Sequence, residues 1–244
     1  MQNYKPFLSY TQQLDKLEND KNLIIANRAY AETMLKRIGY FALISGYKNL
    51  FRNPTTKKYK DGTAFEEIVA LYKFDEGLRE LFLKYMLQIE QTMRSLLSYY
   101  FSRQHGNQQS RYLTRTNYDQ NPRKANDLNR LLNELGDIAL KSKSYDYITY
   151  QRKKYGNIPI WALVKVLTFG NISKMYHCFP QRMQAEVSKN FEKVNEKELM
   201  QYLRVLTKFR NVCAHNDRLF SFVTKDDIPD TALHFKLNIA KKGN

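Results

Sequence analysis

Hydrophobic residues recur every three or four positions along most of the chain, which is the spacing that places them on one side of an α-helix. Residues 39–47 are apolar but lack the alternation of a strand, so they predict a buried helix that ends near Gly46. In the first quarter of the chain the helical stripe comprises Leu14, Leu17, Leu23 to Ile25, Ala31, Met34, Leu35 and Ile38.

The longest helical pattern begins after Gly62 and continues to about Leu97. Thr63 is followed three positions later by Glu66, the spacing of a capping box, so we expect the helix to start at Thr63. The pattern predicts either one long helix or two abutting helices.

Helical spacing returns in the second half of the chain, in residues 128–140, 145–155, 170–179, 183–191 and 196–212. In the segment PIWALVKVLTFG, Pro159 stands in the first turn and Gly170 at the end, which predicts a short buried helix between them. No segment alternates like a sheet strand, so the predicted fold class is all-α. We expect a single domain over residues 1–244, a helical bundle with additional N-terminal helices, in which residues 1–60 form a possible subdomain.

Two polar segments interrupt the helices. Residues 52–62 contain Pro, Asp-Gly and three lysines and predict an exposed basic loop. Residues 105–124 are polar, basic and poor in apolar side chains, so we expect a surface excursion that contacts RNA.

The chain is strongly basic: it has 40 Lys and Arg and 24 Asp and Glu, a formal net charge of +16. A hydrophobic fraction of 43% excludes a disordered chain, and no helix has the lysine-rich polar face of a membrane anchor. Nucleic acid is therefore the favoured partner, although most aromatic residues are expected in the core. The candidate RNA-binding residues are Lys57, Lys58, Lys60, Arg111, Arg115, Arg123, Lys124 and Arg218.

The cysteines and the N-terminus indicate an intracellular protein. Cys178 and Cys213 have no close partner in the sequence, which favours reduced thiols over a metal site or a disulfide framework. The N-terminal residues are polar, and no window approaches the roughly 20 apolar residues of a membrane span. We expect a cytoplasmic location and no membrane contact.

Enzyme motifs are largely missing from the sequence: there is no phosphate-binding P-loop, dinucleotide fingerprint, HExxH, GxSxG or ladder of acidic residues for two metals. We therefore expect neither a cofactor nor a metal ion. One histidine stands out, because His215 follows Arg210 near the end of an amphipathic helix. Arg210 can bind a phosphate and the imidazole of His215 can move a proton, which together suit metal-free RNA cleavage, although the pair alone is also compatible with an ordinary surface.

Five blocks of sequence resemble one known family in the same order. They are IGYFALISGYKNLFR, DGTAFEEIVALYKFDEGLRELFL, IEQTMRSLL, IPIWALVKVLTFGNISKMY and LTKFRNVCAHNDRLF. Together they are similar to the Abi proteins of abortive infection (AbiD/AbiF type), which belong to the HEPN superfamily of helical ribonucleases, together with the nuclease domains of RNA-guided effectors.

The resemblance implies a HEPN-like fold and an endoribonuclease centred on an Arg-Asn-x-x-x-His element, here Arg210, Asn211 and His215. It also implies a toxin-like role in antiphage defence, controlled by a small RNA antitoxin. Lys165 and Ser221 depart from the residues that members often carry, which affects the expected substrate preference.

Only one Arg-His element is present, whereas HEPN nucleases generally bring two together, so a homodimer is expected. Glu90 and Arg94, four residues apart, are expected to form an ion pair and to support the site. Two alternatives to the nuclease stay open: a non-catalytic helical protein that recognises a structured RNA, and a helical scaffold that binds acidic proteins.

Overall fold

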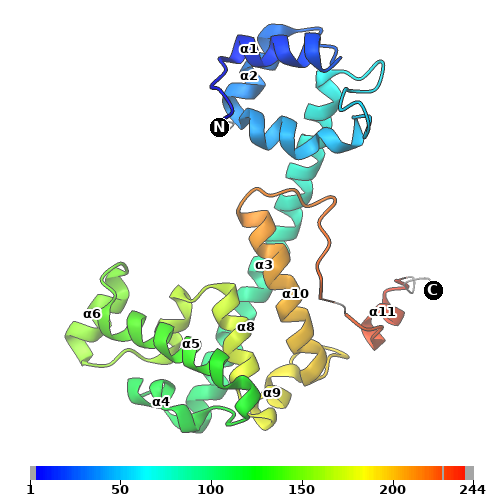
Figure 1. Cartoon of the computed structure of the whole chain (residues 1–244). Helices are drawn as coiled ribbons and strands as arrows, with labels where there is room; N and C mark the ends of the chain where they lie inside the picture. The colour runs from blue at the N-terminus through cyan, green and yellow to red at the C-terminus, as the bar shows by residue number, and fades with distance from the viewer. Residues whose placement is uncertain (1–3, 227, 240–244) are drawn as a thin grey trace. The chain divides into compact units, whose positions relative to one another are not determined.

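In the computed structural model, residues 4–226 and 228–239 are described. The chain folds as two compact units: unit 1 comprises Met1–Leu81 and Val212–Phe222, and unit 2 comprises Phe82–Asn211 and Val223–Asn244. Within the described ranges there is no strand, only two isolated β-bridges, so the predicted all-α class is confirmed (Figure 1).

Unit 1 is built from short helices around the first part of a long one. In chain order these are α1 (Tyr10–Asp15), a π-helical turn (Lys16–Asp20), α2 (Arg28–Ile38), a second π-helical turn (Phe41–Ser45), a 3-10 turn (Lys48–Leu50) and the start of α3 (Phe65–His105). The helix predicted in residues 39–47 is present, separated from α2 by Gly39 at φ +89°. Leu43 and Ile44 are buried as expected, but Phe41 is exposed, so only one side of this turn faces the core.

α3 is one continuous helix of 41 residues, which decides between the two predicted alternatives. Its predicted start is wrong. Glu67, not Glu66, caps the helix, because its Oε2 accepts the backbone N–H of Ala64 at 2.8 Å. The reason is a bridge with residue 24: the carbonyl of Thr63 accepts the N–H of Ile24, so helical backbone begins only at Phe65.

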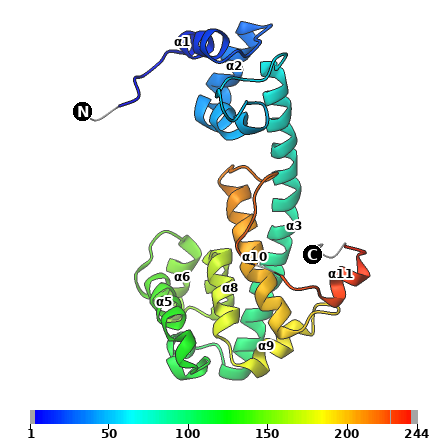
Figure 2. The same cartoon turned by 45° about the vertical axis from the view of Figure 1, so that its right-hand side comes forward.

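In unit 2, the rest of α3, the part of α10 that belongs to this unit and the helices between them in the sequence pack around one hydrophobic cluster. α5 packs against α8, and both can be followed in Figure 2. The helices predicted in the second half of the chain are confirmed. They are α5 (Ala125–Gly136), α6 (Asp146–Tyr155), α8 (Phe169–Cys178), α9 (Gln181–Ser188) and α10 (Glu196–Ala214), and α7 (Ile160–Leu163) lies within the segment predicted after Pro159. The short helices α4 (Gln109–Leu113) and α11 (Ala232–Lys236) were not predicted.

The surface excursion predicted for residues 105–124 is wrong in part. Tyr112 and Tyr118 are buried in the hydrophobic cluster of unit 2, and the segment carries α4 and two 3-10 turns. The hydroxyl of Tyr112 donates to the carbonyl of Ile158, and that of Tyr118 donates to the carbonyl of Tyr112, both at 2.8 Å. Because both hydroxyl groups have hydrogen-bond partners, the two tyrosine rings of this otherwise polar segment can be buried in the core of unit 2.

The helix predicted between Pro159 and Gly170 is also shorter than expected. It ends at Val166, and Gly170 lies inside α8, whose N-cap Thr168 accepts the N–H of Asn171 at 3.2 Å. Leu167, between the two helices, is extended (φ −70°, ψ 141°). Its carbonyl therefore leaves the helical hydrogen-bond pattern and is free to meet a side chain.

In the part of the chain that the structure describes, no helix is both long enough and apolar enough to cross a membrane.

Candidate functional site

A buried carboxylate in unit 2 holds two arginines. The side chain of Glu90, on α3, is only 2% exposed, and its Oε1 accepts a hydrogen bond from Nη2 of Arg94 one turn later. The predicted ion pair is therefore present. The other oxygen, Oε2, lies 3.5 Å from Nε of Arg210 on α10, an ion pair that joins the two helices.

The carbonyl of Leu167 completes this arrangement. It accepts a second hydrogen bond from Nη2 of Arg94 at 2.7 Å. The extended conformation of Leu167 between α7 and α8 is what turns this carbonyl away from a helix and toward the guanidinium. Arg94 is thus held between a carboxylate and a carbonyl that come from different parts of the sequence.

The arginine cluster, defined as Glu90, Arg94 and Arg210, can bind an anion. Two guanidinium groups share one carboxylate, which leaves a net positive charge. In the described residues, the terminal nitrogens of Arg210 form no hydrogen bond, and its side chain is 26% exposed. A planar guanidinium with unused donors matches the oxygens of a phosphate. Tyr147 lies nearby: burial raises the pKa of its hydroxyl, while the charge of Arg94 opposes that rise.

We predict that Glu90→Gln destabilises the fold, because it removes the carboxylate that pairs with both partly buried guanidinium groups. The expected loss is about 1–3 kcal/mol in the free energy of unfolding, measured by urea denaturation. Asp137→Asn is the matched control, since Asp137 and Lys141 form an exposed ion pair with the same spacing and should contribute less than about 1 kcal/mol. Equal effects of the two substitutions would show that Glu90 does not hold the cluster.

His215 stands at the C-terminal cap of α10. The helix ends at Ala214, and the next turn closes with two backbone hydrogen bonds, from Asn216 N–H to the Cys213 carbonyl and from Asp217 N–H to the Val212 carbonyl. This is a Schellman motif, and Asn216 supplies its left-handed residue at φ +55°, a conformation that asparagine tolerates.

The predicted helix end at His215 is therefore confirmed. The side chain of His215 is exposed and takes part in no hydrogen bond or ion pair within residues 4–226 and 228–239. Asn211, the middle member of the Arg-Asn-x-x-x-His element, is also exposed. Arg210 and Asn211 belong to unit 2, whereas His215 belongs to unit 1.

Within unit 1, the chain after His215 is fixed by a second buried carboxylate. Asp75 is fully buried and accepts the backbone N–H groups of Leu219 at 3.0 Å and Phe220 at 2.6 Å. Its Oδ2 also accepts the hydroxyl of Tyr47 at 2.6 Å and Nη1 of Arg79 at 2.7 Å. Burial raises the pKa of Tyr47, so its hydroxyl keeps the proton that it donates.

Further contacts hold the same segment. The ring of Phe220 stacks on Tyr47 with 5.8 Å between centroids, and Arg218 donates a hydrogen bond to the carbonyl of Gly46. The backbone that follows His215 is thus tied to α3 and to the turn before residue 47. These contacts limit where the imidazole of His215 can lie within unit 1.

One comparison identifies the family. Residues 33–221 match the family model described as Abi-like protein. The chain belongs to the Abi-like protein family. Membership indicates a function in abortive infection, and the matched range includes the arginine cluster, Asp75 and His215 of this Abi-like protein. No curated protein and no solved structure matches the chain.

The candidate RNA-binding residues differ in their exposure and in the hydrogen bonds that they already form. In unit 1 the predicted basic loop is present, and Lys58 is exposed, while Lys57 and Lys60 each donate one hydrogen bond to a backbone carbonyl. In unit 2 Arg111, Arg115 and Arg123 are exposed, although Arg115 also bonds to Asn129. Arg218 is half-buried and bonded as described above.

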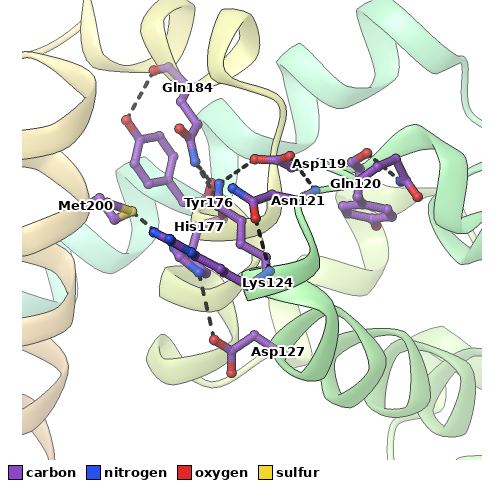
Figure 3. Close-up of polar contacts among 11 residues, drawn as sticks. Asp119, Gln120, Asn121, Lys124, Asp127, Tyr176, His177, Gln184 and Met200 are labelled. Carbon is purple, nitrogen blue, oxygen red and sulfur yellow. Dashed lines mark hydrogen bonds and ion pairs between the residues drawn. The ribbon is translucent and has the colours of Figure 1, made fainter.

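Lys124 has a structural position in the Abi-like protein (Figure 3). Its ammonium donates to Asp119 at 2.6 Å and to the carbonyl of His177 at 2.9 Å, which ties the segment before α5 to the end of α8. The hydrogen bond from Lys124 lowers the pKa of Asp119. With two acceptors already in place, Lys124 is less available to a phosphate than the exposed arginines.

The remaining histidines of the Abi-like protein pack against neighbours. Nδ1 of His177 lies 3.1 Å from the sulfur of Met200, and Nε2 lies 3.8 Å from Asp127 (Figure 3). Burial lowers the pKa of His177. His105 lies against Phe101, and burial lowers its pKa too. His234 accepts the backbone N–H of Thr231 at the start of α11.

Sequence reasoning missed Asp75 in this Abi-like protein, although a signal was present. Asp75 and Arg79 are four residues apart on α3, and they interrupt the stripe of apolar residues that marks the buried side of this helix. A charged pair at i, i+4 within such a stripe indicates an ion pair that is buried with the apolar residues around it. In the described ranges, no group of three or more His, Cys, Asp or Glu side chains is placed to hold a metal ion.

Proposed function

We propose that this protein is a metal-independent endoribonuclease of the HEPN type that acts as a toxin in abortive infection. The observation that carries the proposal is the arginine cluster: Arg210 is anchored by its Nε side on buried Glu90, while its terminal nitrogens have no acceptor in the described chain. The helix that carries Arg210 ends at Ala214, and the imidazole of the next residue, His215, is exposed.

The proposed roles follow from the chemistry of these side chains. Arg210 binds the scissile phosphate and stabilises the negative charge that grows on it in the transition state. His215 acts as general base or general acid when the ribose 2′-hydroxyl attacks phosphorus and the 5′-oxygen leaves. Asn211 positions one of these groups. The products are a 2′,3′-cyclic phosphate and a 5′-hydroxyl, and no metal or cofactor takes part.

The proposal includes a homodimer and a regulatory RNA. A single Arg-His element in each chain requires a second copy to build a two-element site, and two-fold symmetry brings identical segments together. Light scattering measures the dimer directly. A small antitoxin RNA would bind the basic surface and keep the nuclease inactive in the cytoplasm until infection.

The experiment that tests the nuclease is cleavage of RNA by the purified protein in EDTA. We expect the wild type to cut and Arg210→Ala to be inactive. The alternative function, a non-catalytic RNA-binding protein, rests on the same cluster, since Arg94 and Arg210 can recognise phosphate without cutting. RNA binding without strand scission, with or without divalent metal, would favour this alternative.

RNA affinity is expected to fall steeply with salt, because each neutralised phosphate releases counterions. Contacts with six to ten phosphates correspond to a loss of about 10³- to 10⁵-fold between about 50 and 200 mM salt. The triple variant Lys57→Gln, Lys58→Gln and Lys60→Gln should weaken binding and flatten this slope with unchanged helicity by circular dichroism. Lys236→Gln, which removes an exposed lysine paired with Glu192, is the control. A nearly salt-independent affinity would contradict the predicted basic RNA-binding surface.

A further inference from the structure

Unit 2 has an aromatic pocket that is separate from the arginine cluster. Its volume is about 630 Å³, and it lies between the last turns of α3 and the start of α7. Tyr99 and Trp161 flank it, and the residues that line the rest include Ser95, Ser98, Ser102 and Arg103. We call this the Trp161 pocket.

Both aromatic residues of the Trp161 pocket are exposed. Trp161 is the only tryptophan of the chain and is 50% exposed, and Tyr99 is 59% exposed. Single exposed aromatic residues are ordinary on protein surfaces, but two of them that line one pocket offer it two aromatic rings, of which that of Tyr99 also has the Arg103 guanidinium 5.9 Å from its centroid. Flat aromatic ligands are the class that such rings bind best.

Three serines are among the residues that line the Trp161 pocket, and two of them carry the argument. Ser98 donates its hydroxyl to the backbone carbonyl of Ser95 at 3.0 Å and keeps its oxygen lone pairs as acceptors. The hydroxyl oxygen of Ser102 is buried and has no hydrogen-bond partner in the described part of the chain. A buried hydroxyl without a partner is costly, and a ligand that offers a donor or an acceptor would satisfy it.

The pocket continues the arginine cluster along α3. Glu90, Arg94, Ser98 and Ser102 are spaced by four residues, so they form one row on the helix surface. The serines follow Arg94 at about 6 and 12 Å along the helix axis. A row that passes from guanidinium groups to hydroxyl groups and aromatic faces matches a nucleotide chain, which has phosphates followed by bases.

Arg103 adds positive charge at the rim. Its guanidinium lies 4.8 Å from the ring centre of Tyr100 and pairs with Glu186, and about half of the side chain stays exposed. The guanidinium of Arg103 can therefore contact a backbone phosphate while it keeps its contact with the ring of Tyr100.

We propose that the Trp161 pocket binds an unpaired nucleobase of single-stranded RNA, with the base against Trp161 and Tyr99 and its polar edge toward Ser98 and Ser102. The inference rests on the proposed function, because it assumes that RNA is the substrate bound by the arginine cluster. It adds a preference for unpaired RNA, since a base inside a duplex cannot enter the pocket.

The test measures two signals on the same protein. The anisotropy of a labelled single-stranded RNA reports binding, and the fluorescence of Trp161, the only tryptophan, reports occupation of the pocket. We expect the RNA to quench Trp161 at the same concentrations at which it binds. Trp161→Ala should weaken affinity by about 5- to 150-fold, the contribution of one stacked base, and Trp161→Phe should recover part of it.

Tyr155→Ala is the matched control, because Tyr155 is also an exposed aromatic residue of unit 2 but is not among the residues that line the Trp161 pocket. It should bind RNA like the wild type. An RNA of the same length without bases should bind more weakly and leave the fluorescence unchanged. RNA binding that leaves Trp161 unquenched, or that is unaffected by Trp161→Ala in a folded protein, would overturn the pocket and leave the nuclease proposal standing. If no RNA binds by anisotropy, the proposed function itself fails.

Discussion

Replacing His215 with alanine is expected to slow RNA cleavage by about 10²- to 10⁴-fold while RNA affinity and folding stay nearly unchanged. The rate falls because proton transfer at the 2′-hydroxyl or at the leaving oxygen is lost, a contribution of this size in general acid–base catalysis. Folding is preserved because the imidazole is exposed and has no hydrogen-bond partner in the described residues. Affinity is preserved because a neutral imidazole adds little until a proton moves.

Two further variants show whether the loss of cleavage is specific to His215. Arg210→Ala should lower both cleavage and RNA affinity, since the guanidinium grips the phosphate before and during the reaction. His234→Ala removes another histidine, one that only caps the short helix α11, and should cleave RNA like the wild type. Cleavage rates and binding constants are measured separately for each variant. A His215→Ala protein with the wild-type rate would remove His215 from the mechanism.

Replacing Asp75 with alanine is expected to destabilise the protein by about 3–5 kcal/mol. Arg79 is only 3% exposed, and it would be left as a buried charge without its carboxylate. The hydroxyl of Tyr47 and the N–H groups of Leu219 and Phe220 would lose the same acceptor. Urea denaturation gives the loss of stability, and trypsin should cut faster after Arg218, because the segment that follows His215 is released.

The control for Asp75 is again an exposed aspartate. Asp137→Ala removes an ion pair of the same i, i+4 spacing at the surface and should change stability by less than about 1 kcal/mol. If Asp75→Ala were equally harmless, the buried carboxylate would not hold the segment after His215.

The helices could be predicted from the sequence because their cores repeat every three to four residues. The amphipathic stripe of α10, with Leu199 and Leu203 buried, fixes both its class and its approximate length. Helix starts were harder to predict, because they depend on distant partners. The carbonyl of Thr63 is bonded to Ile24, and nothing in the local sequence indicates that contact.

In the candidate site, too, local contacts could be predicted from the sequence and long-range contacts could not. Glu90 and Arg94 are neighbours on one helix turn, so their ion pair could be predicted from spacing alone. The contact of Glu90 with Arg210 joins two helices far apart in the sequence, and the carbonyl of Leu167 depends on where α7 ends. Tertiary packing creates both, and a single sequence holds no periodic signal for either.

The central claim is that Arg210 and His215 cleave RNA through the 2′-hydroxyl without a metal ion. The most direct measurement is the chemistry of the ends produced when the purified protein cuts a defined RNA in EDTA. The account predicts 2′,3′-cyclic phosphate and 5′-hydroxyl ends, and no cleavage at a position where the 2′-hydroxyl is replaced by hydrogen. Ends with 3′-hydroxyl and 5′-phosphate groups, or cleavage that disappears in EDTA, would contradict it.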